Sequence, residues 1–397
     1  MEEQPVMSKL LQDFSVPAVF AGFITFLIGI SVSAVLVIQG AQTLGATPEQ
    51  IASWFWALGL AIGVTGVVLS WKYRYPVATA WSTPGIALII ATGSHYSLQQ
   101  AIGAFVLCGI LTVIVGFSGI FQRLLAKIPL SLSCAMLAGI LLKFGIQLFI
   151  QLEQQWTFVF SLLVIYIISK RLFPRYSIVI TVIAAMILCP ILMSFHFPSL
   201  NWTFSHPVWV TPEFSWAACF GLAFPLFIIN MSSQFLPGIG MIKSYGYQPH
   251  TNSLVGWIGV SQTVLAPFGA FSVCLAAISA AVSLDDQVHP DPKRRYIAGI
   301  SCGVFYIIMG LFAATLTQLL LSFPSAFIMT LAGIALLGTI SHNIAIAFQH
   351  PSDREPAVLT FLMSASGVQL FGIGSAFWGL LLGIIVTVIL NFKPTKH

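Results

Sequence analysis

The stretch PVATAWSTPGIALIIA, residues 76–91, decides the fold because it joins an extended piece to a helix inside one apolar segment. Val, Thr and Trp within residues 77–81 favour a strand. The STPG at 82–85 then predicts a helix start, because Ser or Thr caps a helix and Pro suits its first turn. If the segment lies in a membrane, unpaired helix N–H groups are at membrane depth, where they must face protein or a cavity. Such a terminus also attracts anions, so we expect an anion site here.

Composition assigns the chain to the membrane proteins. Of its 397 residues, 58% are hydrophobic and 7% are charged, with a mean hydropathy of +0.96. A soluble globular protein carries about 25% charged residues. Spanning a bilayer takes about 20 apolar residues, and the first apolar run is too long for a cleavable signal peptide. The fourteen predicted spans are 15–43, 51–71, 77–95, 98–121, 129–150, 156–173, 177–195, 215–236, 252–266, 267–284, 296–319, 325–346, 356–371 and 373–391.

The basic residues predict the topology. Fifteen of the sixteen Lys and Arg residues lie in the tails or in alternate loops, which places them on one side of the membrane. The positive-inside rule makes that side, with both termini, cytoplasmic. The net charge of +5 therefore reflects topology, and we expect no nucleic-acid binding. The exception is Lys143, inside the fifth span, for which snorkelling or packing and substrate attraction are both open interpretations.

Residue types that support catalysis or metal binding are missing from the predicted spans. No Asp or Glu lies inside a span, and the histidines lie in loops, near span ends or at the C-terminus. The six cysteines lie within spans without metal-ligand spacing, which indicates small reduced hydrophobic residues. We therefore expect neither an intramembrane enzyme nor a metal or other cofactor.

Two pairs of segments indicate an internal repeat. Residues 76–91 have a counterpart at 267–281, PFGAFSVCLAAISAA, about 190 residues later. The LAGI that follows Pro129 recurs after Pro324, about 195 residues later. Each half then holds seven spans, and because seven is odd the second half must be inverted. An inverted repeat with one broken helix in each half, here spans three and ten, points to a secondary transporter with its site at the midplane.

Several motifs also resemble a known family. PVATAWSTPG, AMLAGILL, NMSSQFLPGIG, PFGAFSVCLAAISAA, HPDPKRRY and GIGSAFWGL together, over nearly the whole chain, resemble the benzoate:proton symporter (BenE) family. The resemblance implies an all-α polytopic protein of the nucleobase-transporter and sulfate-permease fold, with fourteen transmembrane segments. It also implies a core domain (14–122 and 215–320) that moves against a gate domain (129–196 and 325–391) as an elevator. The expected function is import of benzoate, or a similar small aromatic carboxylate, with protons across the inner membrane. Relatives of the fold are often homodimers.

Twelve residues are expected to line the substrate site. Ser82 and Thr83, and Ser272 in the second half, are expected to cap the two half-helices, and nearby N–H groups would bind a carboxylate; capping alone is the alternative. Trp81 and Phe271 precede the caps and are placed to sandwich an aromatic ring, with plain packing as the alternative. The full set is Gln39, Trp81, Ser82, Thr83, Gly85, Asn230, Ser233, Gln234, Phe271, Ser272, Val273 and Cys274.

The eighth span carries a polar cluster. Asn230, Ser233 and Gln234 share one face by helical spacing, with interhelical hydrogen bonding as the alternative.

The absence of a membrane carboxylate suits an anionic substrate, which a fixed carboxylate would repel, but it leaves proton coupling without an obvious carrier. The proton then travels on the substrate carboxylate itself, or through Asp285 or Asp286 at the inner end of span ten. An anion exchanger or channel of the same fold is the competing function.

Overall fold

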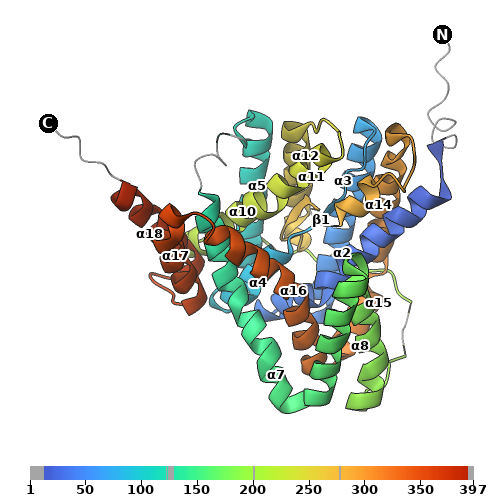
Figure 1. Ribbon diagram of the computed structural model, residues 1–397, viewed down its shortest axis with the longest axis horizontal. Coiled ribbons are helices and arrows are strands. Elements are labelled where there is room, and N and C mark those ends of the chain that lie inside the picture. The colour runs from blue at the N-terminus through green and yellow to red at the C-terminus, as the bar shows by residue number, and fades with distance from the viewer. Residues whose placement is uncertain (1–12, 122, 124–128, 200–201, 277–278, 392–397) are drawn as a thin grey trace, which may run out of the picture.

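The structure, a computed structural model, describes residues 13–121, 123, 129–199, 202–276 and 279–391, and all structural statements concern these residues (Figure 1). Helices make up most of it. The first half contains α2 (Val16–Thr43), α3 (Pro48–Tyr73), β1 (Thr79–Trp81), α4 (Thr83–Thr92), α5 (Leu98–Ser118), α7 (Leu130–Leu172) and α8 (Ser177–Met193).

The second half begins with one helical run, Trp216–Ser244, that contains two π-helical turns. Its pieces are α9 (Trp216–Ala218), η3 (Cys219–Ala223), α10 (Phe224–Ile229), η4 (Asn230–Phe235) and α11 (Leu236–Ser244). The elements that follow are α12 (Thr251–Leu265), β2 (Val273–Leu275), α13 (Ala280–Leu284), α14 (Tyr296–Leu311), α15 (Ala313–Ser322), α16 (Ser325–Ala347), α17 (Arg354–Ser366) and α18 (Ser375–Asn391).

The helices are long and apolar, as the composition predicts. Six helices of the described chain can cross a membrane by length and hydropathy, or seven if the pair α14 and α15, bent by 72°, counts as one span. Two shorter apolar helices, α8 and α18, add to these. The predicted fifth and sixth spans form the single helix α7, whose backbone leaves helical geometry at Gln155 (φ −138°, ψ 54°).

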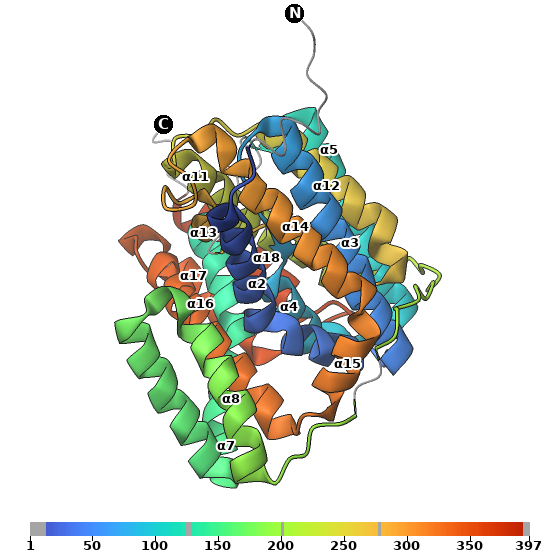
Figure 2. The ribbon, with the colours of Figure 1, turned by 90° about the vertical axis from the view of Figure 1, so that its right-hand side faces the viewer.

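Two groups of helices lie side by side. In one group α3 packs along α14, and α5 packs along α12; in the other, α7 packs against α8, α16 and α17, with α18 beside α17 (Figures 1 and 2). The first helix, α2, contacts both groups through α14 and α16. The two short strands and α4 connect to these helices near the middle of the molecule (Figure 1).

Glycines bring the paired helices close together. A Cβ atom on Gly63 of α3 would lie 2.6 Å from the carbonyl oxygen of Gly303 on α14. A Cβ atom on Gly116 of α5 would lie 2.3 Å from the backbone nitrogen of Gly256 on α12. Small residues at helix contacts allow close backbone approach in membrane proteins, where packing replaces the hydrophobic drive. Both seams therefore depend on the absence of a side chain.

The two interrupted segments meet as a small antiparallel sheet. The register pairs Thr79 with Leu275, Ala80 with Cys274 and Trp81 with Val273. Backbone groups at membrane depth need partners inside the protein, and each extended piece supplies them to the other. An extended piece was predicted in each half. The second was expected before Ser272, whereas the structure places strand β2 at Val273–Leu275 and pairs it with β1.

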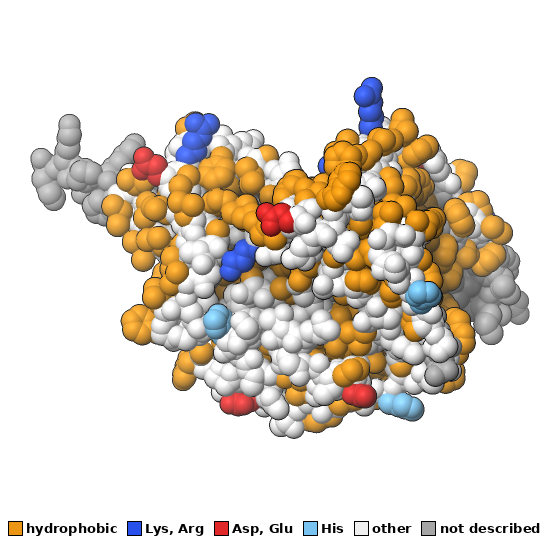
Figure 3. Space-filling model, turned by 90° about the horizontal axis from the view of Figure 1, so that it is seen from below, with side chains coloured by type: hydrophobic (Ala, Val, Ile, Leu, Met, Phe, Trp, Pro, Cys, Tyr) orange, Lys and Arg blue, Asp and Glu red, His pale blue; other side chains and the backbone are white. Residues whose placement is uncertain are grey.

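The surface is as apolar as a bilayer requires. Figure 3 shows hydrophobic side chains over much of the visible face, with only scattered acidic and basic groups. Many large apolar side chains are exposed on the helices, including Ile114, Phe160 and Ile191. In water such a surface would be an aggregation hazard, whereas lipid covers it at no cost.

Candidate functional site

The start of α4 is the junction that the sequence predicts. Ser82 is its N-cap, and the Ser82 hydroxyl accepts a hydrogen bond from the Gly85 N–H at 3.0 Å. Pro84 lies in the first turn, where its missing N–H costs nothing. Thr83, expected as a second cap, is instead the first helical residue, because the cap geometry belongs to Ser82 (φ −81°, ψ 105°). The Gly85 N–H therefore already has an internal acceptor.

Ser33 of α2 holds this junction from the side. Its buried hydroxyl accepts a hydrogen bond from the Trp81 indole N–H at 2.6 Å and one from the Thr83 hydroxyl at 3.1 Å. Sequence reasoning missed Ser33, because a single serine in an apolar helix carries no signal of what it contacts. The structure makes Ser33 the link between α2 and the β1–α4 turn.

The aromatic residues Trp81 and Phe271 occupy separate environments. Trp81 packs edge-on against Phe55, with ring centroids 6.1 Å apart, and its other ring neighbour is Tyr306. Phe271 is fully buried and lies beside Trp54 and Phe105. Each ring is thus enclosed by aromatic neighbours of its own, which favours the packing interpretation for both.

The second junction differs from the prediction. Ser272 was expected to cap a half-helix with the N–H groups of Val273 and Cys274 exposed to substrate, but these two residues belong to strand β2. The Val273 N–H donates to Gln262 Oε1 at 3.2 Å, and α13 begins only at Ala280. The expected cap is wrong because pairing with β1 gives the extended backbone partners that a helix start would leave unpaired. The Ser272 hydroxyl lies 3.4 Å from the Cys274 thiol.

The polar cluster on the eighth span lies in the π-helical turn η4. Asn230 is fully buried, and its side-chain nitrogen donates to the Cys108 sulfur at 3.6 Å. Its side-chain oxygen has no hydrogen-bond partner among the described residues. Ser233 and Gln234 are half-buried. The prediction of one shared face assumed α-helical spacing, and the π-helical turn alters that spacing. π-Turns inside helices are frequent at functional sites, and no local pattern announced this one.

Gln39 connects the two groups of helices. Its side-chain nitrogen donates to the Met329 sulfur on α16 at 3.4 Å. Its side-chain oxygen is buried without a hydrogen-bond partner in the described part of the chain. An unpartnered buried acceptor is costly, so this amide is available to a ligand that carries a donor.

Lys143 has a local structural explanation. The side chain is exposed, and a Cβ atom on Gly367 would lie 2.5 Å from its ammonium nitrogen. Gly367 is the left-handed C-cap of α17 (φ 69°). A helix C-terminus carries partial negative charge and favours a nearby cation, which supports the packing interpretation.

Asp285 and Asp286 follow α13 directly. Asp285 accepts a hydrogen bond from the Gln287 N–H at 3.0 Å, and Asp286 is exposed. Asp13, which precedes α2, accepts a hydrogen bond at 2.9 Å from the hydroxyl of Tyr296, the first residue of α14.

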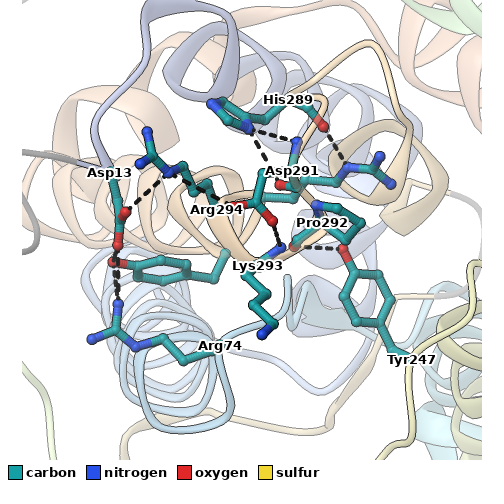
Figure 4. Close-up of polar contacts among 10 residues, drawn as sticks. Asp13, Arg74, Tyr247, His289, Asp291, Pro292, Lys293 and Arg294 are labelled. Atoms are coloured by element: carbon teal, nitrogen blue, oxygen red, sulfur yellow. Dashed lines mark hydrogen bonds and ion pairs between the residues drawn. The ribbon is translucent and has the colours of Figure 1, made fainter.

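Asp13 and the loop between α13 and α14 make further polar contacts. Arg74 and Arg294 each lie 3.3 Å from an Asp13 oxygen. The Tyr247 hydroxyl donates to the Pro292 carbonyl at 2.9 Å, and burial raises the pKa of Tyr247 (Figure 4). Within the described residues no group of three or more His, Cys, Asp or Glu could hold a metal.

A buried strand pair that leads into a capped helix start, inside an apolar helical protein, is the architecture of a membrane transporter. The fold is similar to that of SLC26A9, with a TM-score of 0.65 and 15% identity, covering 97% of this chain and 67% of that one. It is also similar to the transmembrane domain of the cyanobacterial bicarbonate transporter BicA (TM-score 0.55, 14% identity), covering 94% of this chain and 96% of that one.

Sequence comparison gives the family. The model of the BenE family, described as benzoate membrane transport protein, matches residues 12–389, and the chain belongs to this family. The chain is 41% identical to the inner membrane protein YdcO of Escherichia coli, over 96% of this chain and 97% of that protein. It is 36% identical to the benzoate membrane transport protein of Acinetobacter baylyi, over 98% of both chains.

Proposed function

We propose that the protein is a secondary active transporter that imports benzoate, or a similar small aromatic carboxylate, together with protons. The observation that carries this proposal is the capped start of α4, buried at the strand pair in a chain of the benzoate transport family. A helix N-terminus favours an anionic group. The spans contribute no carboxylate that would repel the substrate. The membrane is the inner membrane, with both termini cytoplasmic.

The protein is proposed to work as an elevator built from two inverted repeats of seven spans, with segments three and ten broken. Two features support the inverted repeat: the antiparallel pairing of β1 with β2, and the matching seams α3–α14 and α5–α12. The core domain comprises 14–122 and 215–320, and the gate domain 129–196 and 325–391. Helix packing supports this division: α3 and α5 of the core pack along α14 and α12, and α7 of the gate packs against α8, α16 and α17. Gln39 of α2, in the core, contacts Met329 of the gate.

The substrate contacts are proposed to lie between α4, α2 and η4. Thr83, Gln39, Ser233 and Gln234 supply polar groups there, and Asn230 an unpartnered oxygen. The remaining predicted residues are proposed to shape the site from β1, the start of α4, and strand β2 with the two residues before it: Trp81, Ser82, Gly85, Phe271, Ser272, Val273 and Cys274. In this scheme the proton enters on the substrate carboxylate itself.

The test is uptake of labelled benzoate into proteoliposomes with an acidic exterior and the voltage clamped at zero. Protein-free liposomes are subtracted, because the neutral acid crosses lipid unaided. Thr83→Val and Gln234→Ala are expected to weaken saturable uptake. The matched controls are Thr92→Val, at the other end of α4, and Gln42→Ala, exposed on α2.

Two outcomes would overturn parts of this proposal. Saturable uptake that survives collapse of the pH gradient and depends on a counter-anion would favour an exchanger. The similarity of the fold to anion transporters makes this the second candidate. Absence of any protein-dependent uptake would remove benzoate as the substrate and leave the fold unaffected.

A further inference from the structure

A serine at the end of α3 binds the extended segment of the first half. The fully buried Ser70 hydroxyl accepts a hydrogen bond from the Val77 N–H at 2.9 Å, and it lies 3.4 Å from the Val77 carbonyl oxygen, to which it donates. One side chain therefore satisfies both backbone groups of the residue that leads into β1. Because Val77 is fully buried in the protein, each of these groups would otherwise be unpaired.

A glutamine on α12 pairs backbone groups of the extended segment in the second half. The fully buried Gln262 accepts a hydrogen bond from the Val273 N–H at 3.2 Å through Oε1. Its Nε2 donates to the Phe271 carbonyl at 3.3 Å and to the Phe105 carbonyl of α5 at 3.2 Å. The single amide thus joins three elements, α12, β2 and α5.

The two contacts are related by the repeat. Gln262 lies 192 residues after Ser70, and Val273 lies 196 residues after Val77, close to the offset of the repeated motifs. The helix packed behind each contact also matches. A Cβ atom on Gly299 of α14 would lie 2.2 Å from the Ser70 hydroxyl, and Phe105 of α5 stands 194 residues before Gly299. Different side chains, a serine and a glutamine, therefore make equivalent hydrogen bonds to the backbone in the two halves.

We infer that Ser70 and Gln262 are positioning residues that hold the two strands in register and so set the geometry of the substrate site. A slip of one residue in a strand would turn every side chain to the other face. For β1 such a slip would move Ser82 away from the start of α4, and for β2 it would move Phe271 and Ser272. Neither positioning residue touches the substrate. The consequence for transport rests on the proposed function.

The first experiment tests the two hydrogen-bonded contacts without any substrate. Backbone hydrogen exchange is measured on the purified full-length protein and on Ser70→Ala and Gln262→Met. Exchange at Val77 is expected to rise about tenfold in the first variant, and exchange at Val273 about tenfold in the second, since an opening free energy lower by about 1.4 kcal/mol is a tenfold change. Two variants are the controls. Ser261→Ala removes a hydroxyl that donates to a carbonyl of its own helix, and Gln248→Met replaces an exposed glutamine in a loop. Unchanged exchange at both strands would overturn the inference.

The second experiment reads transport by benzoate counterflow, with equal pH on both sides so that the driving force is constant. Gln262→Met is expected to raise KM about tenfold while the maximal rate stays within about twofold, the signature of a misplaced binding geometry. Gln262→Glu adds a readout that a purely structural loss would not show. Burial raises the pKa of a carboxyl, and the protonated form keeps one donor and one acceptor. Because one of the two amide donors is lost, its KM at pH about 6 should lie between those of the wild type and Gln262→Met, and it should rise further at pH about 9.

The outcomes separate this inference from the proposed function. If the wild type transports no benzoate, the proposed function fails, and hydrogen exchange still decides whether the two contacts hold the strands. If the wild type transports benzoate and Gln262→Met and Gln262→Glu keep its KM at every pH, the positioning role is overturned. If Gln262→Met fails to fold, the pH profile of Gln262→Glu decides.

Discussion

Replacing Ser33 by Ala tests whether α2 holds the site junction through one hydroxyl. The substitution removes the acceptor of the Trp81 indole N–H, now 2.6 Å away, and of the Thr83 hydroxyl, 3.1 Å away. A buried donor left without a partner costs about 1–3 kcal/mol. The Thr83 hydroxyl can rotate toward another acceptor, so it adds only about 0.5 kcal/mol. We expect Ser33→Ala to lower the free energy of unfolding by about 2 kcal/mol.

The assay is a double-mutant cycle with Trp81→Phe, measured by reversible unfolding in mixed detergent micelles. Because Phe has no N–H, Ser33→Ala should cost about 1.5 kcal/mol less in the Trp81→Phe background. Ser31→Ala, on the same helix, is the control and is expected to change stability by less than about 0.5 kcal/mol. Strict additivity of Ser33→Ala and Trp81→Phe, or a Ser33→Ala effect no larger than that of the control, would refute the reasoning.

Three further predictions follow from single contacts. The Asp285→Asn, Asp286→Asn double variant should keep pH-driven benzoate uptake within about twofold, because the proton is proposed to travel on the substrate; loss of the pH dependence would route it through these carboxylates. Gly63→Ala should destabilise by about 1–3 kcal/mol in thermal unfolding, because the added Cβ would meet a backbone carbonyl of α14 at 2.6 Å, whereas Gly240→Ala, in open space, should not. Burial raises the pKa of Tyr75 to about 12, above its ordinary value of 10.0, so its stabilising contribution is complete below pH 10 and is lost as the pH rises toward 12. Tyr296, whose pKa burial also raises to about 12, shares this late step. In an absorbance titration of tyrosinate the step should therefore be smaller by one tyrosine in Tyr75→Phe, and an unchanged titration would contradict the assignment.

Local chemistry in the sequence was enough to predict several features of the structure. Hydropathy predicts a helical membrane protein, and the STPG at 82–85 predicts a helix start that the structure confirms at Ser82. The motif resemblance to the benzoate transport family is confirmed by the family match over residues 12–389. Each of these depends on residues near one another in the chain, where composition, capping and spacing act directly.

The second junction and the eighth span were beyond such reasoning. Residues 272–274 read locally as a helix start, yet pairing with a strand about 195 residues away makes them extended. The π-turn η4 changes the helical spacing from Asn230 onward, and α-helical periodicity cannot reveal it. At the second junction a tertiary contact overrides the local preference.

The sequence by itself determined the membrane class, the family and the first half-helix, because burial in lipid and helix capping follow from short-range chemistry. Only the tertiary structure decided which polar groups hold that site. Ser33, Ser70 and Gln262 look in sequence like isolated polar residues in apolar helices, and their roles appear only with their partners. The physical reason is that lipid offers no hydrogen bonds, so each backbone or side-chain polar group must find a partner elsewhere in the fold.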